Sequence, residues 1–300
     1  TDISKKRKIL KDIGERIGYK LGISGTHPSS LCKNQDFVGS KSYEWVANQL
    51  NYYAKRNVTF STHVHISVPC NDSSIYITNM ARRWLPGLLA LSANSPFFEN
   101  EITGMRSSRT FQFGSFPRTE IPPFIESYDE YTKIVNNLTE SNAITNPRQI
   151  WWKVRPNINL GTVELRVCDA QRSLKNVEMI VAISQALIHS LYQDFLENKE
   201  ALELNLIYLN DSLWKSARFG FDSIIYDEYD NCFISIKEHI EELLNYISGS
   251  LYFFKNQHVI KTVNNILNNG AEVDDQLDIY KKSGMDGLKK YLVNNVEYTI

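Results

Sequence analysis

Hydrophobic and polar positions repeat with two different periods, and the change of period separates a strand-containing first half from a helical second half. Ile9, Ile13 and Ile17 recur four residues apart, which predicts a helix over residues 3–17. Apolar and polar residues alternate over residues 60–69, which predicts a strand with one apolar face. Strands are predicted at residues 19–24, 60–69, 151–155 and 162–169.

The remaining segments are either long and amphipathic or rich in turn-forming residues. Residues 97–123 are rich in glycine, serine, proline and aromatic residues and are too long for a simple connection, so they form a candidate functional loop. No internal repeat or low-complexity linker interrupts the chain, and the whole pattern predicts an α+β fold. Further helices are predicted at residues 43–55, 74–93, 128–138 and 177–196, with mainly helical structure from residue 201.

The composition is that of a globular protein with a substantial core, because 42% of the 300 residues are hydrophobic. The 33 basic and 34 acidic residues nearly cancel, so no overall field attracts nucleic acid or an anionic membrane, and neither is expected as a partner. The basic run at residues 5–8 would suit an RNA-binding tail, but we favour the solvated face of the first helix.

The four cysteines are scattered, without a CxxC pair or a close group of cysteine and histidine. The sequence therefore indicates neither a disulfide framework nor a structural zinc site of that kind. The chain opens with polar and basic residues rather than an apolar signal segment, and its longest apolar stretch, around residues 85–91, is too short to cross a bilayer. Scattered thiols also suit a reducing compartment, so a cytoplasmic location is expected.

Three of the predicted strands place ionisable side chains on one face. Two ligands at positions i and i+2 of a strand stand ~6.6 Å apart at their Cα atoms and can lean toward one ion. Imidazole with carboxylate suits a divalent cation, and guanidinium groups suit phosphate or carboxylate. Such a face would hold a metal–nucleotide complex and an acidic substrate. The residues are His63, His65 and Ser67 on one strand, Lys153 and Arg155 on another, and Thr162, Glu164 and Arg166 on the third.

Each of these signals also has a structural interpretation. Histidines two apart on a strand are often satisfied by backbone carbonyl groups, and a glutamate two residues from an arginine is more often an ion pair. Arg109 lies in the long loop and could be solvated, and His27 is as apt to cap a turn as to touch a ligand. No phosphate-cradling glycine motif or nucleophile elbow is present. Core or surface roles are expected for the histidines in helical segments, which are His189, His239 and His258.

Taken together and in order, these segments resemble the type-2 glutamate–cysteine ligases, which are carboxylate–amine ligases related to glutamine synthetase. The two most specific stretches are Leu89-Ala-Leu-Ser-Ala-Asn-Ser-Pro96 and Gly161-Thr-Val-Glu-Leu-Arg-Val-Cys-Asp169. The resemblance covers nearly the whole chain. Further matching stretches are Gly25-Thr-His-Pro28, His63-Val-His65, Thr103-Gly104, Ser107-Ser-Arg109, Pro117-Arg118, Pro122-Pro123, Arg155-Pro156 and Trp214-Lys-Ser-Ala-Arg-Phe-Gly220.

The resemblance implies one glutamine synthetase-like ligase domain over residues 1–300, strand-rich at 19–170 and mainly helical at 171–300. Its active site would be the concave face of a curved antiparallel sheet, with helices packed on the convex face. The resemblance also implies ATP and Mg²⁺, used to activate the γ-carboxyl group of glutamate as an acyl phosphate. Cysteine or another amine would then displace the phosphate. Family members commonly self-associate, so a homodimer is expected.

The resemblance suggests a role for each candidate residue. His63 and Glu164 look like metal ligands. His65, Lys153 and Arg166 would face the nucleotide, and Arg155 and Arg166 would offset charge on the transferring phosphoryl group or the glutamate. Substrate contacts would come from Thr26, His27 and Arg109, with Arg109 holding a carboxylate.

The sequence departs from the family pattern at its start. The family opens with a strand that bears a Gly-x-Glu-x-Glu motif and contributes to the metal site, whereas this chain is expected to start in the following helix. A site with too few carboxylates binds Mg²⁺ weakly. A rival hypothesis is therefore a non-catalytic member of the family, which binds a nucleotide or an amino acid or serves as a partner subunit.

Overall fold

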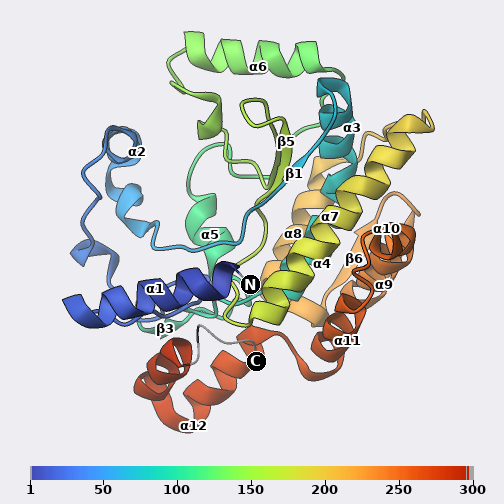
Figure 1. Cartoon of the computed structure of the whole chain (residues 1–300). Helices are drawn as coiled ribbons and strands as arrows, with labels where there is room; N and C mark the ends of the chain where they lie inside the picture. The colour runs from blue at the N-terminus through green and yellow to red at the C-terminus, as the bar shows by residue number, and fades with distance from the viewer. Residues whose placement is uncertain (1, 295, 297–300) are drawn as a thin grey trace.

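The computed structural model describes residues 2–294 and 296 (Figure 1). The fold is α+β, as predicted, and the named strand pairs are all antiparallel. No helix among these residues is long and apolar enough to span a membrane. The strands are β1 (Val64–Ser67), β2 (Phe97–Phe98), β3 (Glu101–Ile102), β4 (Val154–Asn157), β5 (Thr162–Leu165), β6 (Ile224–Asp227) and β7 (Cys232–Ser235). The helices are α1 (Asp2–Ile17), α2 (Lys41–Leu50), α3 (Asn71–Ala81), α4 (Leu85–Ser92), α5 (Ser108–Gly114), α6 (Tyr128–Glu140), α7 (Leu174–Leu196), α8 (Leu206–Phe219), α9 (Ile236–Tyr246), α10 (Ser248–Phe253), α11 (Val259–Asn269) and α12 (Glu272–Val293).

The central sheet has the strand order β1–β5–β4, so β5 is paired on both sides. One face of this sheet is apolar and packs against helices α3 and α7, which run beside the strands (Figure 1). Val154, Val163 and Leu165 are at most 2% exposed on that face. Each such side chain stabilises the fold by about 1.5–3 kcal/mol on burial, so the apolar face fixes which side of every strand points to the polar face.

The strands predicted at residues 60–69 and 162–169 are confirmed, although each is shorter than predicted. The strand predicted at 151–155 is displaced, since β4 begins at Val154. The amide of Lys153 donates to the carbonyl group of Glu120 rather than to a strand. Segment 19–24 is not a strand, because the amide of Ile23 bonds to Leu292 at the end of α12 and only an isolated bridge follows, at Thr26.

The helix predicted at residues 74–93 is broken into α3 and α4 by a 3₁₀ turn at Arg82–Trp84. Pro86 explains the break. It has no amide hydrogen and its ring would collide with the carbonyl group four residues earlier, which belongs to Arg82, so a new helix starts with Pro86 in its first turn. The helix predicted at 43–55 likewise ends at Leu50 and continues as a 3₁₀ segment.

The first helix is confirmed, but the basic run within it is not entirely a solvated face. Arg7 is buried, and its guanidinium donates to the carbonyl oxygens of Gln171, Arg172 and Val296 at 2.7–3.0 Å. The lysines on either side of it are exposed. One arginine of the run therefore anchors α1 to the segment that joins β5 to α7.

Two hairpins, β2–β3 and β6–β7, were not predicted from the hydrophobic pattern of the sequence. Within the predicted long loop, β2 and β3 pair across Glu99 and Asn100, which both have positive φ, as a tight two-residue hairpin turn requires. The second hairpin, β6–β7, lies in the region predicted to be mainly helical. Its strands are four residues long, too short for alternation to separate them from a helical pattern.

Asp169 lies just beyond β5, fully buried, and joins three segments of the chain. Its Oδ2 accepts hydrogen bonds from the amide of Asn94 (2.9 Å) and the hydroxyl of Ser95 (2.6 Å). Its Oδ1 accepts from the hydroxyl of Ser107 (2.9 Å) and from Nε of Arg109 (2.5 Å). This carboxylate therefore holds the segment after α4 and the start of α5 against the end of β5.

Gly25 packs directly on this carboxylate, because a Cβ atom there would lie 2.7 Å from Cγ of Asp169 and 2.9 Å from Cβ of Ser95. We expect Gly25→Ala to lower the free energy of unfolding by about 1–3 kcal/mol, the range of an overpacked core. Urea denaturation measures this change. Gly39→Ala is the control, since its Cβ would meet no described atom within 4 Å. A Gly25 variant as stable as the wild type would contradict this packing.

Candidate active site

The strand register brings chemically active residues into one row across the sheet. Glu164 on β5 lies opposite His65 on β1 and opposite Arg155 on β4. Residues in one row point to the same face, so the three side chains share the polar face. His63 precedes β1 and Arg166 follows β5, and both of their side chains reach the carboxylate of Glu164.

The Glu164 carboxylate is the point on which this group converges. Its Oε1 lies 2.5 Å from Nη1 of Arg166, 3.3 Å from Nδ1 of His63 and 3.4 Å from Nε2 of His65. Its Oε2 accepts a hydrogen bond of 2.8 Å from Nε of Arg155. The structure therefore brings together two imidazoles, two guanidinium groups and one carboxylate that the sequence analysis had assigned to three different strands.

The charge of Glu164 is fixed by these neighbours. Burial alone would raise the pKa of its carboxyl group, but Arg166 and Arg155 outweigh burial and lower that pKa to about 2. The residue is only 2% exposed. It is therefore an ionised carboxylate that is itself shielded from water, beside two imidazole side chains that are 32% and 33% exposed.

The two imidazoles are each oriented by a hydroxyl group. Nε2 of His63 lies 2.7 Å from Oγ of Ser61, and Nδ1 of His65 lies 3.0 Å from Oγ1 of Thr162. Burial, and next to it Arg166, lowers the pKa of His63 to about 3 although Glu164 opposes them. His63 is therefore neutral near pH 7, which is the form that can bind a cation.

A divalent ion could bind these donors if Arg166 turned aside, because Nη1 of Arg166 lies 3.3 Å from Nδ1 of His63 and 2.5 Å from Oε1 of Glu164. Nδ1 of His63 and Oε1 of Glu164 are 3.3 Å apart, close to the separation of two ligands on one small cation. A single carboxylate and an imidazole leave most positions of a Mg²⁺ ion to water and phosphate, which is how Mg²⁺ binds at nucleotide sites. His63 and Glu164 are thus the described residues that could hold such an ion here.

Three arginines surround the site, and backbone oxygens hold two of them in place. Nη1 of Arg155 donates to the carbonyl oxygens of Arg148 and Ile150. Arg109 is buried rather than solvated, since it pairs with Asp169 and donates through Nη2 to the carbonyl group of Val167. Burial, with Arg155 beside it, lowers the pKa of Arg166 to about 10. Three such cations in one buried face favour an anionic ligand.

Lys153 is the other unusual cation of this face. Its side chain is 3% exposed, and Nζ has no hydrogen-bond partner among residues 2–294 and 296. Burial, together with Arg109 and Arg166, lowers the pKa of Lys153 to about 7. A buried amine without a partner is costly unless a ligand supplies one.

Two of the predicted substrate-binding residues, Thr26 and His27, form hydrogen bonds within the protein. Thr26 is 1% exposed, and its hydroxyl donates to the carbonyl group of Phe97 at 2.6 Å. Nδ1 of His27 accepts hydrogen bonds from the amides of Ser29 (3.3 Å) and Ser30 (2.9 Å), so His27 does cap a turn. Its other ring nitrogen then carries the proton. Both residues line a pocket of about 460 Å³ between this segment and α12.

The sequence interpretation assigned no role to the residues that support the site. Ser61, Thr162 and Asp169 orient His63, His65 and Arg109 respectively. Alternation had placed Thr162 on the polar face with Glu164. It could also have placed Ser61 there, because Ser61 precedes His63 by two positions and therefore shares its face. Asp169 lies beyond the end of β5, where alternation has no predictive value.

The buried amine of Lys153 gives the protein a pH-dependent stability. While protonated, Lys153 opposes folding, and this effect declines as the pH rises above about 7 and ends near the ordinary lysine value of 10.5. We expect Lys153→Met to be more stable than the wild type at pH 6, with the difference shrinking toward pH 10. Urea denaturation across this pH range measures it, with the exposed Lys133→Met as control. A stability difference that does not vary with pH would refute the claim that burial lowers the pKa of Lys153.

The chain is similar to known proteins over nearly its whole length. Residues 1–292 match the family described as Glutamate-cysteine ligase family 2. A protein of Solibacter usitatus named "Putative glutamate--cysteine ligase 2" is 32% identical over an alignment of 307 positions. The alignment covers 99% of this chain and 79% of that protein. A protein of the same name from Herpetosiphon aurantiacus is 30% identical over 283 residues, which cover 94% of this chain and 74% of that protein.

The fold has a solved counterpart. The crystal structure of glutamate–cysteine ligase from Francisella tularensis in complex with AMP superimposes with a TM-score of 0.66. The match covers 93% of this chain and 72% of that one at 12% identity, so it establishes the fold alone. With the family match extending over residues 1–292, the chain belongs to glutamate–cysteine ligase family 2, a family of ligases.

Proposed function

We propose that the chain is an ATP- and Mg²⁺-dependent carboxylate–amine ligase that forms a γ-glutamyl amide from glutamate and cysteine or a similar amine. The observation that supports this most is the convergence of His63, Arg155 and Arg166 on the buried carboxylate of Glu164. The names of the relatives from Solibacter and Herpetosiphon support the amino-acid substrates. The AMP in the Francisella ligase supports a nucleotide.

The proposed reaction has two steps, formation of an acyl phosphate and its displacement by the amine, and needs no other reagent. An oxygen of the γ-carboxylate of glutamate attacks the γ-phosphorus of ATP, the bond between that phosphorus and the bridging oxygen breaks, and ADP leaves. The amine nitrogen then attacks the acyl carbon, the acyl carbon–oxygen bond breaks, and phosphate leaves with the former carboxylate oxygen. The amine loses a proton in this step. Both steps move negative charge among oxygens, so fixed positive charge is the main catalytic requirement.

His63 and Glu164 would hold the Mg²⁺ ion, which would neutralise phosphate charge and help to align the reacting groups. The lowered pKa values of both residues support this choice, because ligands must be deprotonated to bind a metal ion. His65 lies in the same row on the edge strand and would face the nucleotide or a second ion.

The cations of the polar face would bind the anionic groups. Arg155 and Arg166 are oriented by Glu164 and would offset charge on the phosphoryl group as it transfers. Lys153 would contact the nucleotide, because an anionic phosphate would supply the partner that its amine lacks among the described residues.

Substrate binding is proposed for three residues outside this row. Arg109 would hold a carboxylate of the amino acid, with its guanidinium kept in place by Asp169. The free ring nitrogen of His27 would donate to the same substrate, and Thr26 would hold the segment that positions His27. A few side chains lining such a pocket would decide which amine is accepted.

Phosphate release tests the proposal, with Glu164→Gln as the decisive variant. The wild type should release phosphate from ATP and Mg²⁺ when both L-glutamate and L-cysteine are present. Glu164→Gln should reduce this turnover at least a hundredfold, roughly the loss expected from one key electrostatic group. The exposed Glu178→Gln on α7 is the control and should behave as the wild type does.

The other outcomes are equally clear. A folded Glu164→Gln variant with normal turnover would exclude Glu164 as a metal ligand. No phosphate release by the folded wild-type chain, with any of several amines added, would favour the rival role in which the chain binds a nucleotide or an amino acid without catalysis.

Arg166 should not tolerate replacement by lysine. A guanidinium can donate to Glu164 and to a phosphate at once in a fixed plane, whereas an ammonium group is a single point charge. We expect Arg166→Lys to lower kcat by about a hundredfold with a smaller effect on KM for ATP. Steady-state kinetics measure both constants, with the exposed Arg16→Lys as control. A wild-type rate would make Arg166 a structural partner of Glu164.

A further inference from the structure

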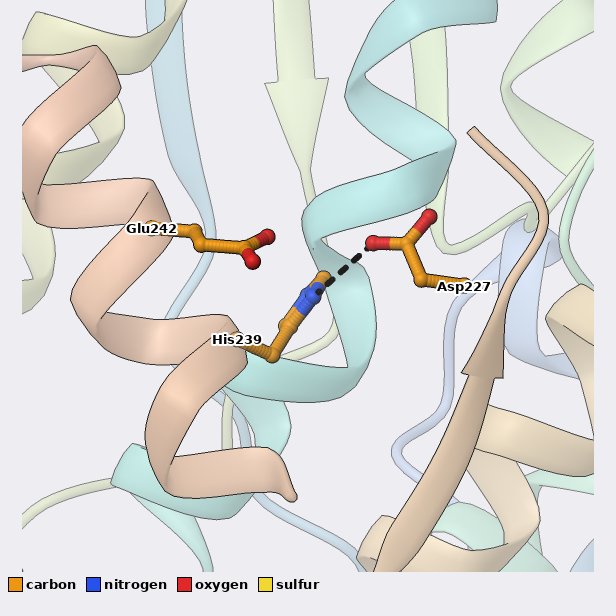
Figure 2. A group of neighbouring side chains, drawn as sticks. All are labelled: Asp227, His239 and Glu242. Atoms are coloured by element: carbon orange, nitrogen blue, oxygen red, sulfur yellow. Dashed lines mark ion pairs between the residues drawn. The ribbon is translucent and has the colours of Figure 1, made fainter. Parts of the chain in front are cut away.

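A second group of metal-ligating side chains lies in the helical half of the chain and shares no residue with the Glu164 site. Asp227 ends strand β6, and His239 and Glu242 lie one turn apart on α9. Figure 2 shows the imidazole of His239 between the two carboxylates. Each residue offers one ligand atom, and the three atoms lie within 4.8 Å of one another.

His239 lacks the partners that a buried histidine normally has. The residue is 1% exposed, and neither ring nitrogen has a hydrogen-bond partner in the part of the chain that the structure describes. Nδ1 makes an ion-pair contact of 3.6 Å with Oδ2 of Asp227 (dashed in Figure 2), which is longer than a hydrogen bond. The ring of His239 packs 5.1 Å from that of Trp84. A polar group buried in this way is destabilising unless something binds it. The ring therefore points to a ligand between it and the carboxylates.

The charge of the group points the same way. Arg83 is the cation paired with Asp227 (2.8 Å), Asp230 and Glu242 (3.2 Å). One guanidinium thus faces three carboxylates. The local surplus is two negative charges, which a divalent cation would balance.

The geometry and donor types select the class of ion. Ligands of a tetrahedral zinc ion stand roughly 3.3 Å apart, given bonds of about 2.0–2.2 Å. The 3.6 Å between His239 and Asp227 already matches this, and Glu242, whose side chain is 40% exposed, can close the remaining gap. This second site offers only protein ligands, and one imidazole nitrogen with two carboxylate oxygens suits Zn²⁺. Mg²⁺ takes most of its ligands from water and phosphate, as proposed for the Glu164 site, and Ca²⁺ prefers six or more oxygens.

Arg83 does not block such an ion. Its guanidinium is packed over the rings of Trp84 (4.5 Å) and Tyr229 (4.1 Å), and its Nε donates to Asp227 at 2.9 Å. If the more exposed Glu242 turned from Arg83 to the ion, these contacts with Trp84, Tyr229 and Asp227 would still hold Arg83 in place. Arg83 then orients Asp227 from the side, as outer partners of metal ligands do.

We propose that Asp227, His239 and Glu242 form a structural metal site for a zinc-type divalent cation. The ion ties the β6–β7 hairpin to α9 and is separate from the ion used in catalysis. The expected effect is on stability and metal content, and none is expected on the identity of the substrates.

The test is a titration of the full chain with ZnCl₂, followed by calorimetry and by thermal unfolding. Glu164→Gln is introduced first, so that the proposed catalytic ion contributes nothing. In this background we expect one Zn²⁺ per chain and a higher Tm in its presence. Adding Glu242→Gln should weaken Zn²⁺ binding at least tenfold, since changes even in outer partners cost about 10–100-fold. Glu241→Gln, at the exposed neighbouring position on the same helix, is the matched control and should bind as before.

A spectrum separates this site from adventitious surface binding. Co²⁺ in place of Zn²⁺ should give the visible absorption of a four-coordinate site, and Glu242→Gln should abolish that absorption. The proposal is overturned if the Glu164→Gln chain binds no Zn²⁺, if Glu242→Gln and Glu241→Gln bind it equally well, or if Mg²⁺ binds as tightly as Zn²⁺.

Discussion

The ionised carboxylate of Glu164 is the charge on which the polar face of this protein depends. It lies in the central strand, 2% exposed, and meets Arg155, Arg166 and the two imidazoles of His63 and His65. Without it, the buried guanidinium groups of Arg155 and Arg166 would lose their carboxylate partner, which is destabilising. The same carboxylate therefore offsets the positive charge of the polar face, and in the proposed function it would also hold a metal ion.

The continuation of the same strand holds the second anchor. Asp169 accepts hydrogen bonds from the segment after α4 and from the start of α5, and it fixes Arg109 beside the polar face. The segment from Glu164 to Asp169 therefore both supplies the candidate ligand and joins the loops around it.

The polar face could be predicted from sequence because alternation is a local property. It placed His65 and Glu164 on one face of the sheet, and His63 and Arg166, just outside the strands, reach the same carboxylate. Register is not local, so the row of His65, Glu164 and Arg155 emerged only from the pairing of β1 and β4 with β5. The break at Pro86, the anchor at Arg7 and the β6–β7 hairpin depend on tertiary contacts or on very short elements. For the same reason the group of Asp227, His239 and Glu242 has no signature along the chain.

The most direct test of the account is the path of oxygen from glutamate to phosphate. L-Glutamate labelled with ¹⁸O in both γ-carboxyl oxygens is incubated with the chain, ATP, Mg²⁺ and L-cysteine, and the released phosphate is analysed by mass spectrometry. Because the acyl phosphate loses phosphate together with a former carboxylate oxygen, the account predicts one ¹⁸O atom in each phosphate for each amide formed. Amide formation with unlabelled phosphate would contradict it and would show that the carboxylate is activated in another way.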